Sequence, residues 1–407
     1  MLRLHKLIIN QSFSCRYIIS ACSLFLAFIG CKHSPEGIPI LDELELHTGY
    51  NPKGINFFHH KGDTGIYCYN YATAKKVTLF DLDGRKKDSI DLSVLTNKVG
   101  SVWDATFTSG FFFAIGETGI VFQINMKGEI LREIDLTKIT PSLLGDDKFG
   151  FTNLKSTTIN DTIRVFVSPY WSSPTDHKKQ NYFQLLTNND VKVLKIQKNN
   201  TLKNPLTLEL KITDTVLVEK HLTNIYSILG DTSLYGITFN RPVFRVFKEK
   251  LLLKSYFSNK IVEYDFIQKR AKIHQLKYNG LPYVNEGLRY KELEGFGSQS
   301  FYEKYVYGTM RRNSYILYVI PNLRDKTYVV VLKHETNKQD EVNFLDSKKT
   351  LLYCDKDFNI LKSYEIEKDK VGFRFRSFGS DFFIVNIASK QVEFGKVKLL
   401  KLKNEIY

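Results

Sequence analysis

The sequence predicts an all-β protein, and within that class a β-propeller. Short segments with alternating apolar and polar residues recur between turns rich in Gly, Asn and Asp. The chain also contains 30 Phe and 23 Tyr, and aromatic residues suit the half-buried surface of a strand. Two neighbouring segments match each other at an offset of 44 residues. A period of this length, with four short strands per unit, is typical of propeller blades.

The matching segments are residues 78–92 and 122–136. Asp81 aligns with Asn125, and Gly84 aligns with Gly128. We expect each segment to form a strand, a tight turn and a second strand. The Asp or Asn side chain opens such a turn by accepting backbone hydrogen bonds, and Gly adopts the positive φ that the turn requires.

Weaker copies of this hairpin occur at residues 261–276 and 352–366. Asp265 and Asp355 begin their turns, but neither turn contains the Gly. Together the segments predict blades at residues 57–92, 103–136, 151–196, 242–276 and 301–366.

Residues 373–402 supply only about three further strands, so we expect residues 43–47 to join them as a fourth and close the ring. Six blades is the preferred count. Seven is the alternative, because residues 206–240 also have the pattern of strands. A large β-sandwich or two β domains would be the other fold classes open to an all-β chain.

The N-terminus has the features of a bacterial lipoprotein leader. Arg3, Lys6 and Arg16 precede the apolar run 17–30, and Cys31 follows this run directly. This run is shorter than the roughly 20 residues of a spanning helix, as in a secretory signal peptide. Its end resembles a lipobox, in which the Cys thiol is acylated, for example by palmitate, although an ordinary cleaved signal or an uncleaved anchor is the alternative. We therefore expect export and lipid anchoring in the cell envelope, at the outer membrane.

The expected organisation has three parts. Residues 1–30 form the signal peptide, residues 31–41 form a polar tether, and residues 42–407 form a single propeller domain. The Gly30-Cys31 junction, the repeated strand-Asp/Asn-x-x-Gly-strand hairpins and the strand that opens at Arg241-Pro242 resemble a family of uncharacterised propeller-like lipoproteins of Bacteroidota. This resemblance implies a six- or seven-bladed propeller at the cell envelope and implies no activity.

The net charge and the cysteines indicate which kinds of binding partner and covalent bond to expect. The formal net charge is +15, of which the leader supplies three, but the basic residues are scattered along the chain. Scattered Lys residues are typical of solvated strand edges, and an exported lipoprotein seldom meets nucleic acid, so we expect no nucleic-acid partner. We expect a monomer anchored to the membrane by its lipid, with an envelope protein or a glycan as partner. Cys68 and Cys354 are expected to be buried, unpaired thiols.

Motifs for catalysis or cofactor binding do not occur in the sequence. It lacks a G-x-S-x-G elbow, an H-E-x-x-H helix, a P-loop and a dinucleotide fingerprint. His59, His60 and Asp63 are close in sequence, but adjacent residues of a strand point to opposite faces, which disfavours a shared metal ion. We expect no cofactor and no metal.

The residues that could bind a ligand are arginines and aromatics. Arginines on innermost strands would line the central channel, where a guanidinium binds carboxylate or phosphate bidentately. The competing interpretation is that these arginines pair with acids at blade edges. Exposed Trp residues on loops could contact a glycan. The candidates are Arg241, Arg245, Arg311, Arg312, Arg374, Arg376, Trp103 and Trp171.

Three functions are compatible with these features. The preferred one is a non-enzymatic binding or scaffold protein of the envelope, with a protein, peptide or glycan ligand. The second is an enzyme that acts on carbohydrate or peptide at the axial mouth, which would require paired carboxylates. Carboxylates available for it are Asp104, Glu117, Glu263 and Asp265. The third is a sensor or regulator of an uptake system.

Overall fold

The computed structural model describes residues 40–52, 54–60, 63–70, 75–95, 98, 102–116, 118–144, 149–171, 205–222, 243–254, 259–278, 314–321, 327–334, 348–366, 374–378, 381–386 and 396–402. They belong to one compact unit, Ile40–Tyr407. Antiparallel β-sheet dominates this unit, and a short helix, α3 (Leu136–Leu144), follows one of the strands. None of the helices in these ranges is long and apolar enough to cross a membrane.

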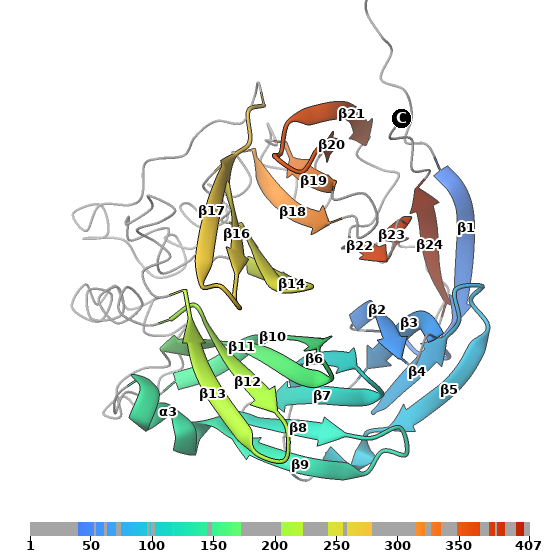
Figure 1. Cartoon of the computed structure of the whole chain (residues 1–407). Coiled ribbons are helices and arrows are strands. Elements are labelled where there is room, and N and C mark those ends of the chain that lie inside the picture. Colours follow the sequence, from blue (N-terminus) through green and yellow to red (C-terminus); the bar gives the residue numbers. More distant parts are fainter. Residues whose placement is uncertain are drawn as a thin grey trace, which may run out of the picture. The chain divides into compact units, whose positions relative to one another are not determined.

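Five blades are each built from four consecutive antiparallel strands (Figure 1). Blade 1 contains β2 (Gly54–His60), β3 (Asp63–Asn70), β4 (Lys76–Phe80) and β5 (Lys86–Asp91). Blade 2 contains β6 (Val102–Thr108), β7 (Phe111–Gly116), β8 (Ile120–Ile124) and β9 (Ile130–Asp135). Blade 3 contains β10 (Phe149–Ile159), β11 (Thr162–Trp171), β12 (Thr207–Ile212) and β13 (Val216–His221).

The last two consecutive blades follow the same order. Blade 4 contains β14 (Val243–Phe247), β15 (Lys250–Lys254), β16 (Lys260–Asp265) and β17 (Arg270–Gln275). Blade 5 contains β18 (Tyr315–Pro321), β19 (Tyr328–Lys333), β20 (Lys349–Cys354) and β21 (Ile360–Ile366). The all-β class and the propeller architecture are therefore confirmed.

A further four-stranded sheet is assembled from both ends of the unit. Its order is β1 (Ile40–His47), β24 (Lys396–Leu402), β23 (Asp381–Asn386) and β22 (Arg374–Phe378). β1 pairs antiparallel with β24, from Ile40 opposite Leu402 to His47 opposite Lys396. β22 lies at the other edge of this sheet and packs against β2 and β18.

The expected ring of six or seven blades closed by the N-terminal strand needs correction. Blades of consecutive strands number five, and the sixth sheet is composite. Leu46 of β1, the outer edge strand, and Val397 and Leu399 of β24 pack this composite sheet on blade 1, in a cluster with Ile55, Ile66, Cys68 and Phe80. The seventh blade is wrong because β12 and β13, which lie in the region considered for it, complete blade 3.

The predicted Asp/Asn–Gly hairpins are present. The Asp81 carboxylate accepts hydrogen bonds from the backbone N–H groups of Asp83 and Arg85, at 3.0 and 2.8 Å. Asn125 accepts the equivalent pair from Lys127 and Glu129, both at 2.9 Å. Gly84 and Gly128 have φ values of 82° and 84°, so both turns use the conformation that favours Gly.

The weaker copies form similar turns without Gly. Asp265 accepts backbone hydrogen bonds from Ile267 and Gln268, and Asp355 accepts them from Asp357 and Asn359. The positive φ falls on non-Gly residues, at 56° for Lys269 and 64° for Phe358. In these turns a residue with a side chain adopts a positive φ, which is sterically unfavourable. In blades 1 and 2 a Gly, which has no Cβ, occupies the equivalent position.

The core lies between blades. Buried residues of blades 1 and 2 form one cluster, in which the rings of Phe58 and Phe107 meet edge to face with centroids 5.1 Å apart. Each fully buried aromatic or aliphatic side chain contributes about 1.5–3 kcal/mol relative to exposure, so the sheets are held together chiefly by these faces. Cys68 and Cys354 are buried and free, as predicted, and burial raises the pKa of the Cys354 thiol to about 12.

Candidate functional site

A cavity of about 550 Å³ lies among the first strands of the blades. Its walls come from β2, β6, β10, β14 and β18, with additional residues from β3 and β15. This volume is in the usual range for small-molecule sites. Polar and charged residues of the wall are Asn56, Asp104, Thr106, Asn153, Lys155, Ser156, Arg245 and Lys254; aromatic ones are Phe57, Tyr67, Tyr69, Phe107, Phe244, Phe247 and Tyr318.

Three of the wall strands are irregular where they border the cavity. Pairing shifts register between Val102 and Asp104 in β6, between Thr152 and Lys155 in β10, and between Ile316 and Tyr318 in β18. A β-bulge changes the direction of the side chains that follow it, and bulges are enriched next to active sites. The irregularities therefore direct side chains of three blades toward the same space.

An ion pair links blades 2 and 3 at the cavity wall. Lys155 Nζ lies 3.1 Å from Asp104 Oδ2 and also donates to the carbonyl oxygen of Leu154 at 2.8 Å. Thr106 and Ser156, on the same two strands, share a hydrogen bond of 2.9 Å. Asp104 and Lys155 therefore neutralise each other and leave this side of the cavity polar but close to uncharged.

Two basic residues occupy the side formed by blade 4. Lys254 lies opposite Val243 in the β14–β15 pairing, and Arg245 is two residues further along β14, so both side chains are on one face. The Arg245 guanidinium lies over the ring of Tyr318 in blade 5, 5.7 Å from its centroid. Lys254 Nζ donates to the carbonyl oxygen of Ile316, also in blade 5, at 2.9 Å.

The Lys254 amine is in an unusual environment. The residue is only 4% exposed. Burial lowers the pKa of its ammonium group well below the usual value, and the charge of Arg245 lowers it further. The pair therefore creates a positive site in which one member, Arg245, keeps its charge at every physiological pH.

Few of the predicted ligand residues can be placed in this site. Arg245 lines the cavity, and its role in ligand binding stays a prediction. Arg374 and Arg376 lie on β22, Trp103 lies on β6 and Trp171 ends β11, but their side chains are not among those described. Cys31, Arg241, Arg311 and Arg312 fall outside the described residues.

Among the described carboxylates considered for an enzyme, Asp104 alone lines the cavity. Asp104 lines the cavity, Glu263 accepts hydrogen bonds from Lys250 and from Tyr328, and Asp265 caps a turn. Glu117 lies outside the described residues. Among the described residues of the cavity wall, Asp104 is the only carboxylate, so the paired acids of a glycosidase are not brought together there.

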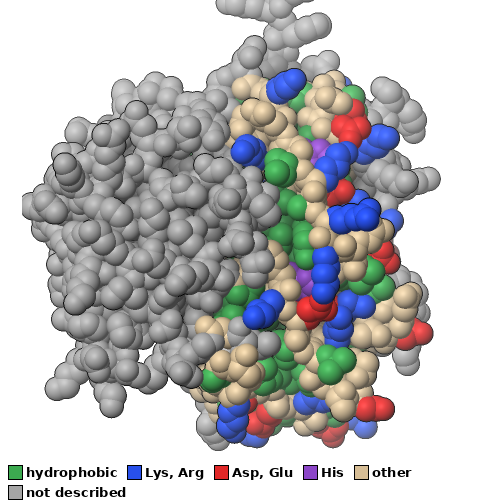
Figure 2. All heavy atoms as spheres, turned by 60° about the vertical axis from the view of Figure 1, so that its left-hand side comes forward, with side chains coloured by type: hydrophobic (Ala, Val, Ile, Leu, Met, Phe, Trp, Pro, Cys, Tyr) green, Lys and Arg blue, Asp and Glu red, His purple; other side chains and the backbone are tan. Residues whose placement is uncertain are grey.

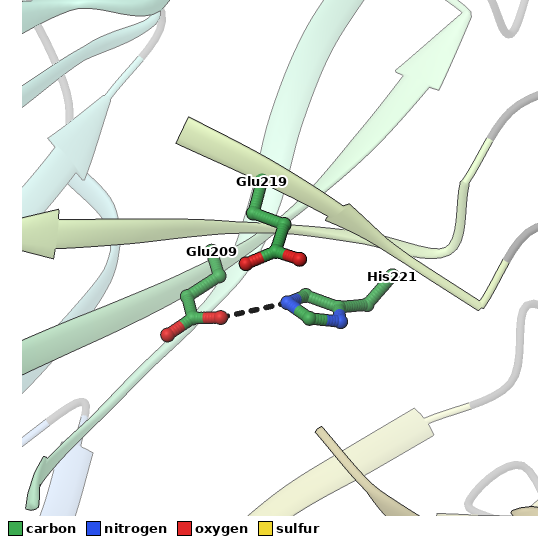
Figure 3. Close-up of side chains that lie close together, drawn as sticks. All are labelled: Glu209, Glu219 and His221. Carbon is green, nitrogen blue, oxygen red and sulfur yellow. Dashed lines mark hydrogen bonds and ion pairs between the residues drawn. The ribbon is translucent and has the colours of Figure 1, made fainter. Parts of the chain in front are cut away.

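A second cluster, which was not predicted from the sequence, lies between blades 3 and 4. Glu209 of β12 is directly opposite Glu219 of β13, and His221 is two residues further along β13 (Figure 3). Glu209 and His221 have fully buried side chains, and their closest approach is 2.7 Å, from Oε2 to Nε2. The other ring nitrogen of His221 lies 3.2 Å from the Tyr264 hydroxyl of blade 4.

The cluster contains residue types that bind metal ions. Its carboxylates, however, are already paired with Arg and Lys side chains, as in a network of ion pairs. Atoms of Glu209, Glu219 and His221 that could ligate an ion lie within 4.8 Å of one another. Cations already engage both carboxylates: Arg164 binds Glu209 at 2.5 Å, and Lys211 binds Glu219 at 2.6 Å. Lys269, from the β16–β17 turn, binds Glu219 as well. These two hydrogen-bonded lysines lower the pKa of Glu219 to about 2.

His59, His60 and Asp63 lie on the hairpin of β2 and β3, where His60 is opposite Asp63. Their side chains are outside the described set, so the expectation that they bind no metal stays a prediction.

Charge is mixed on the coloured part of the face shown in Figure 2. On the face shown in Figure 2, Lys and Arg side chains lie in separate groups with acidic, polar and apolar side chains between them. This distribution agrees with the scattered basic residues of the sequence. It differs from the cavity, where Arg245 and Lys254 are adjacent.

One solved structure shares this fold along almost the whole chain. It is a member of the DUF4221 family from Bacteroides vulgatus, with a TM-score of 0.68, 13% sequence identity, and coverage of 91% of this chain and 99% of that chain. At this identity the likeness shows the fold alone. It confirms the propeller-like part of the expected resemblance, and lipid anchoring stays a prediction.

Other comparisons add little. BamB from Moraxella catarrhalis has a TM-score of 0.37 and 7% identity, covering 91% of this chain and 99% of that one. The propeller domain of Cps50 (Swd1) from Myceliophteria thermophila has a TM-score of 0.40 and 8% identity, covering 89% and 100%. No family model matches the chain, and no curated protein matches it.

Proposed function

We propose that this protein binds a carboxylate-bearing ligand of small-molecule size in the axial cavity of its propeller, without chemical conversion as its main role. The observation that carries the proposal is that Arg245 and Lys254 share one face of blade 4 and both line the same cavity. A guanidinium in a partly desolvated space binds a carboxylate more strongly than one in water, because less charge is screened.

The rest of the cavity wall supports binding rather than catalysis. Tyr69 and Tyr318 provide amphipathic surfaces with apolar faces and polar hydroxyls. Asp104, the only carboxylate among the described residues of the wall, is already paired with Lys155. The ligand class that fits is a small organic acid, a sugar acid, or the terminal carboxylate of a larger molecule that reaches into the cavity.

The proposed location is the cell envelope, where Cys31 would carry lipid and residues 31–41 would tether the propeller near the membrane. The leader sequence supports this location. Cys31→Ser should release the protein from the membrane fraction and abolish labelling by radioactive palmitate. Membrane association that survives this substitution would overturn the proposed anchor.

Isothermal titration calorimetry with purified protein tests the ligand class. Galacturonate and succinate should release or absorb heat with saturation, and galactose, which is the neutral analogue of galacturonate, should bind at least about tenfold more weakly, as expected for loss of a charge-assisted hydrogen bond. Equal binding of galacturonate and galactose would contradict an anion site, as would a lack of binding by both acids.

A further inference from the structure

We infer that Lys254 forms a Schiff base with oxo acids, small aldehydes or ketones that carry a carboxylate, while Arg245 binds the carboxylate. The inference rests on the proposed anion site and deepens it, because it adds a covalent step and a narrower ligand class. It follows from the placement of one buried amine and one guanidinium on the same wall of the same cavity.

The position of Lys254 suits a nucleophilic amine. Its Nζ donates to the Ile316 carbonyl oxygen at 2.9 Å, which fixes the end of an otherwise flexible side chain at the cavity wall. A neutral amine that donates one hydrogen keeps the lone pair that attacks a carbonyl carbon. Burial and the neighbouring charge of Arg245 favour the neutral form, as in other lysines that form Schiff bases.

Arg245 provides the selectivity for an acid. It lies on the same face as Lys254, and its guanidinium is oriented by the ring of Tyr318. A carboxylate held there brings a carbonyl group of the same small molecule next to the amine, and orientation of this kind increases the rate of the addition.

The chemistry balances without another reactant. The Nζ lone pair forms a bond to the carbonyl carbon, and the carbonyl oxygen takes up a proton as the nitrogen loses one, which gives a carbinolamine. The hydroxyl group then takes up a proton and leaves as water while the nitrogen lone pair forms the C=N bond, and the nitrogen releases its remaining proton to give the imine. The net change is one amine and one carbonyl converted into one imine and one water.

Lys155 is the internal comparison, because it lines the same cavity but pairs with Asp104 at 3.1 Å. Its Nζ donates to a carboxylate, whereas Lys254 Nζ donates to the uncharged carbonyl oxygen of Ile316. If Lys254 reacts and Lys155 does not, the selectivity must come from the environment of the amine, because both lysines line the same cavity.

The test is reductive trapping. Full-length protein is incubated at neutral pH with glyoxylate and sodium cyanoborohydride, which reduces an imine to a stable carboxymethyl amine, and the modified lysines are identified by peptide mass spectrometry. We expect Lys254 to be labelled first, ahead of Lys155 and of Lys127, an exposed lysine in a turn. Arg245→Gln should slow labelling of Lys254 by about tenfold, as expected for loss of a charged hydrogen bond. Arg85→Gln, at an exposed turn, should leave it unchanged.

Three outcomes would overturn the inference. Lys254 could react no faster than Lys127, it could react equally with propionaldehyde, or its labelling could be insensitive to Arg245→Gln. Lys254→Arg replaces the primary amine by a guanidinium, which cannot form the imine, and must abolish the adduct. If succinate binds in an Arg245-dependent way while Lys254 stays unlabelled, the covalent step fails and the proposed anion site stands; if succinate does not bind either, both fail.

Discussion

Lys254 Nζ donates to the carbonyl oxygen of Ile316 across the boundary between blades 4 and 5, at 2.9 Å. The bond joins β15 to β18 at the wall of the axial cavity. It therefore links the stability of the propeller to the protonation of a residue that we place in the ligand site.

The free energy of unfolding should depend on Lys254 at alkaline pH. The folded pKa of this amine is lowered, so between that pKa and its ordinary value of 10.5 the unfolded chain binds a proton that the native protein does not. Stability conferred by this residue must then rise with pH through that interval. Urea unfolding of the wild type and of Lys254→Met over a series of pH values up to 10.5 should show the wild type gaining on the variant as the pH rises above the lowered pKa. A constant difference would contradict the lowered pKa.

Glu219 should confer stability that is lost in acid. Its folded pKa is about 2, compared with 4.5 for an ordinary Glu, because Lys211 and Lys269 bind its carboxylate. The contribution is complete above pH 4.5 and decreases as the pH falls toward 2. Glu219→Gln should therefore be less stable than the wild type at pH 6, and the two should converge as the pH falls from 4.5 to 2. Persistence of the full difference at the acid end would contradict this account.

Removal of the buried carboxylate of Glu209 should be costly. Glu209→Gln leaves Arg164 without its ionic partner and removes the carboxylate that faces the fully buried His221, and breaking a buried ion pair usually costs about 3–5 kcal/mol. Glu133→Gln is the control, since Glu133 pairs with Lys98 on the surface, where a pair is worth about 1 kcal/mol or less. Urea unfolding at neutral pH measures both, and similar losses for the two variants would argue against a structural role for the buried network.

The turn glycine of blade 2 should not tolerate a side chain. Gly128 has a φ of 84°, and a Cβ there would lie 2.7 Å from the Asp91 carbonyl oxygen of blade 1. Gly49 has a similar φ of 73°, but a Cβ at that position would have nothing within 4 Å. Gly49→Ala should therefore cost only the backbone strain of about 1–2 kcal/mol, and Gly128→Ala should cost more because the backbone of blade 1 must also move. Equal thermal shifts would show that the close approach is easily relieved.

The sequence predicted local turns better than long-range pairing. Asp81, Asn125, Gly84 and Gly128 identify their hairpins because the turn chemistry lies within a few residues. The third blade was placed too early, since β12 begins at Thr207, long after β11 ends at Trp171. When two paired strands are this far apart in the sequence, their spacing does not show that they pair.

The candidate site was only partly predictable, for a related reason. Arg245 could be proposed because Arg241 and Arg245 are four residues apart and would share one face of a strand. Lys254 has no such signal, because it ends an apolar strand where a solvated Lys is common. The cluster of Glu209, Glu219 and His221 depends on the pairing of β12 with β13 and on the approach of blade 4, and neither can be read from spacing.

The most direct test of the central claim is the affinity for galacturonate of three variants at Arg245 and at a control position. We predict that Arg245→Gln weakens binding by about 10- to 100-fold, that Arg245→Lys recovers part of this loss, and that Arg85→Gln, which removes the same charge at an exposed turn, binds as the wild type does. Equal affinities of Arg245→Gln and Arg85→Gln would contradict an anion site in the axial cavity.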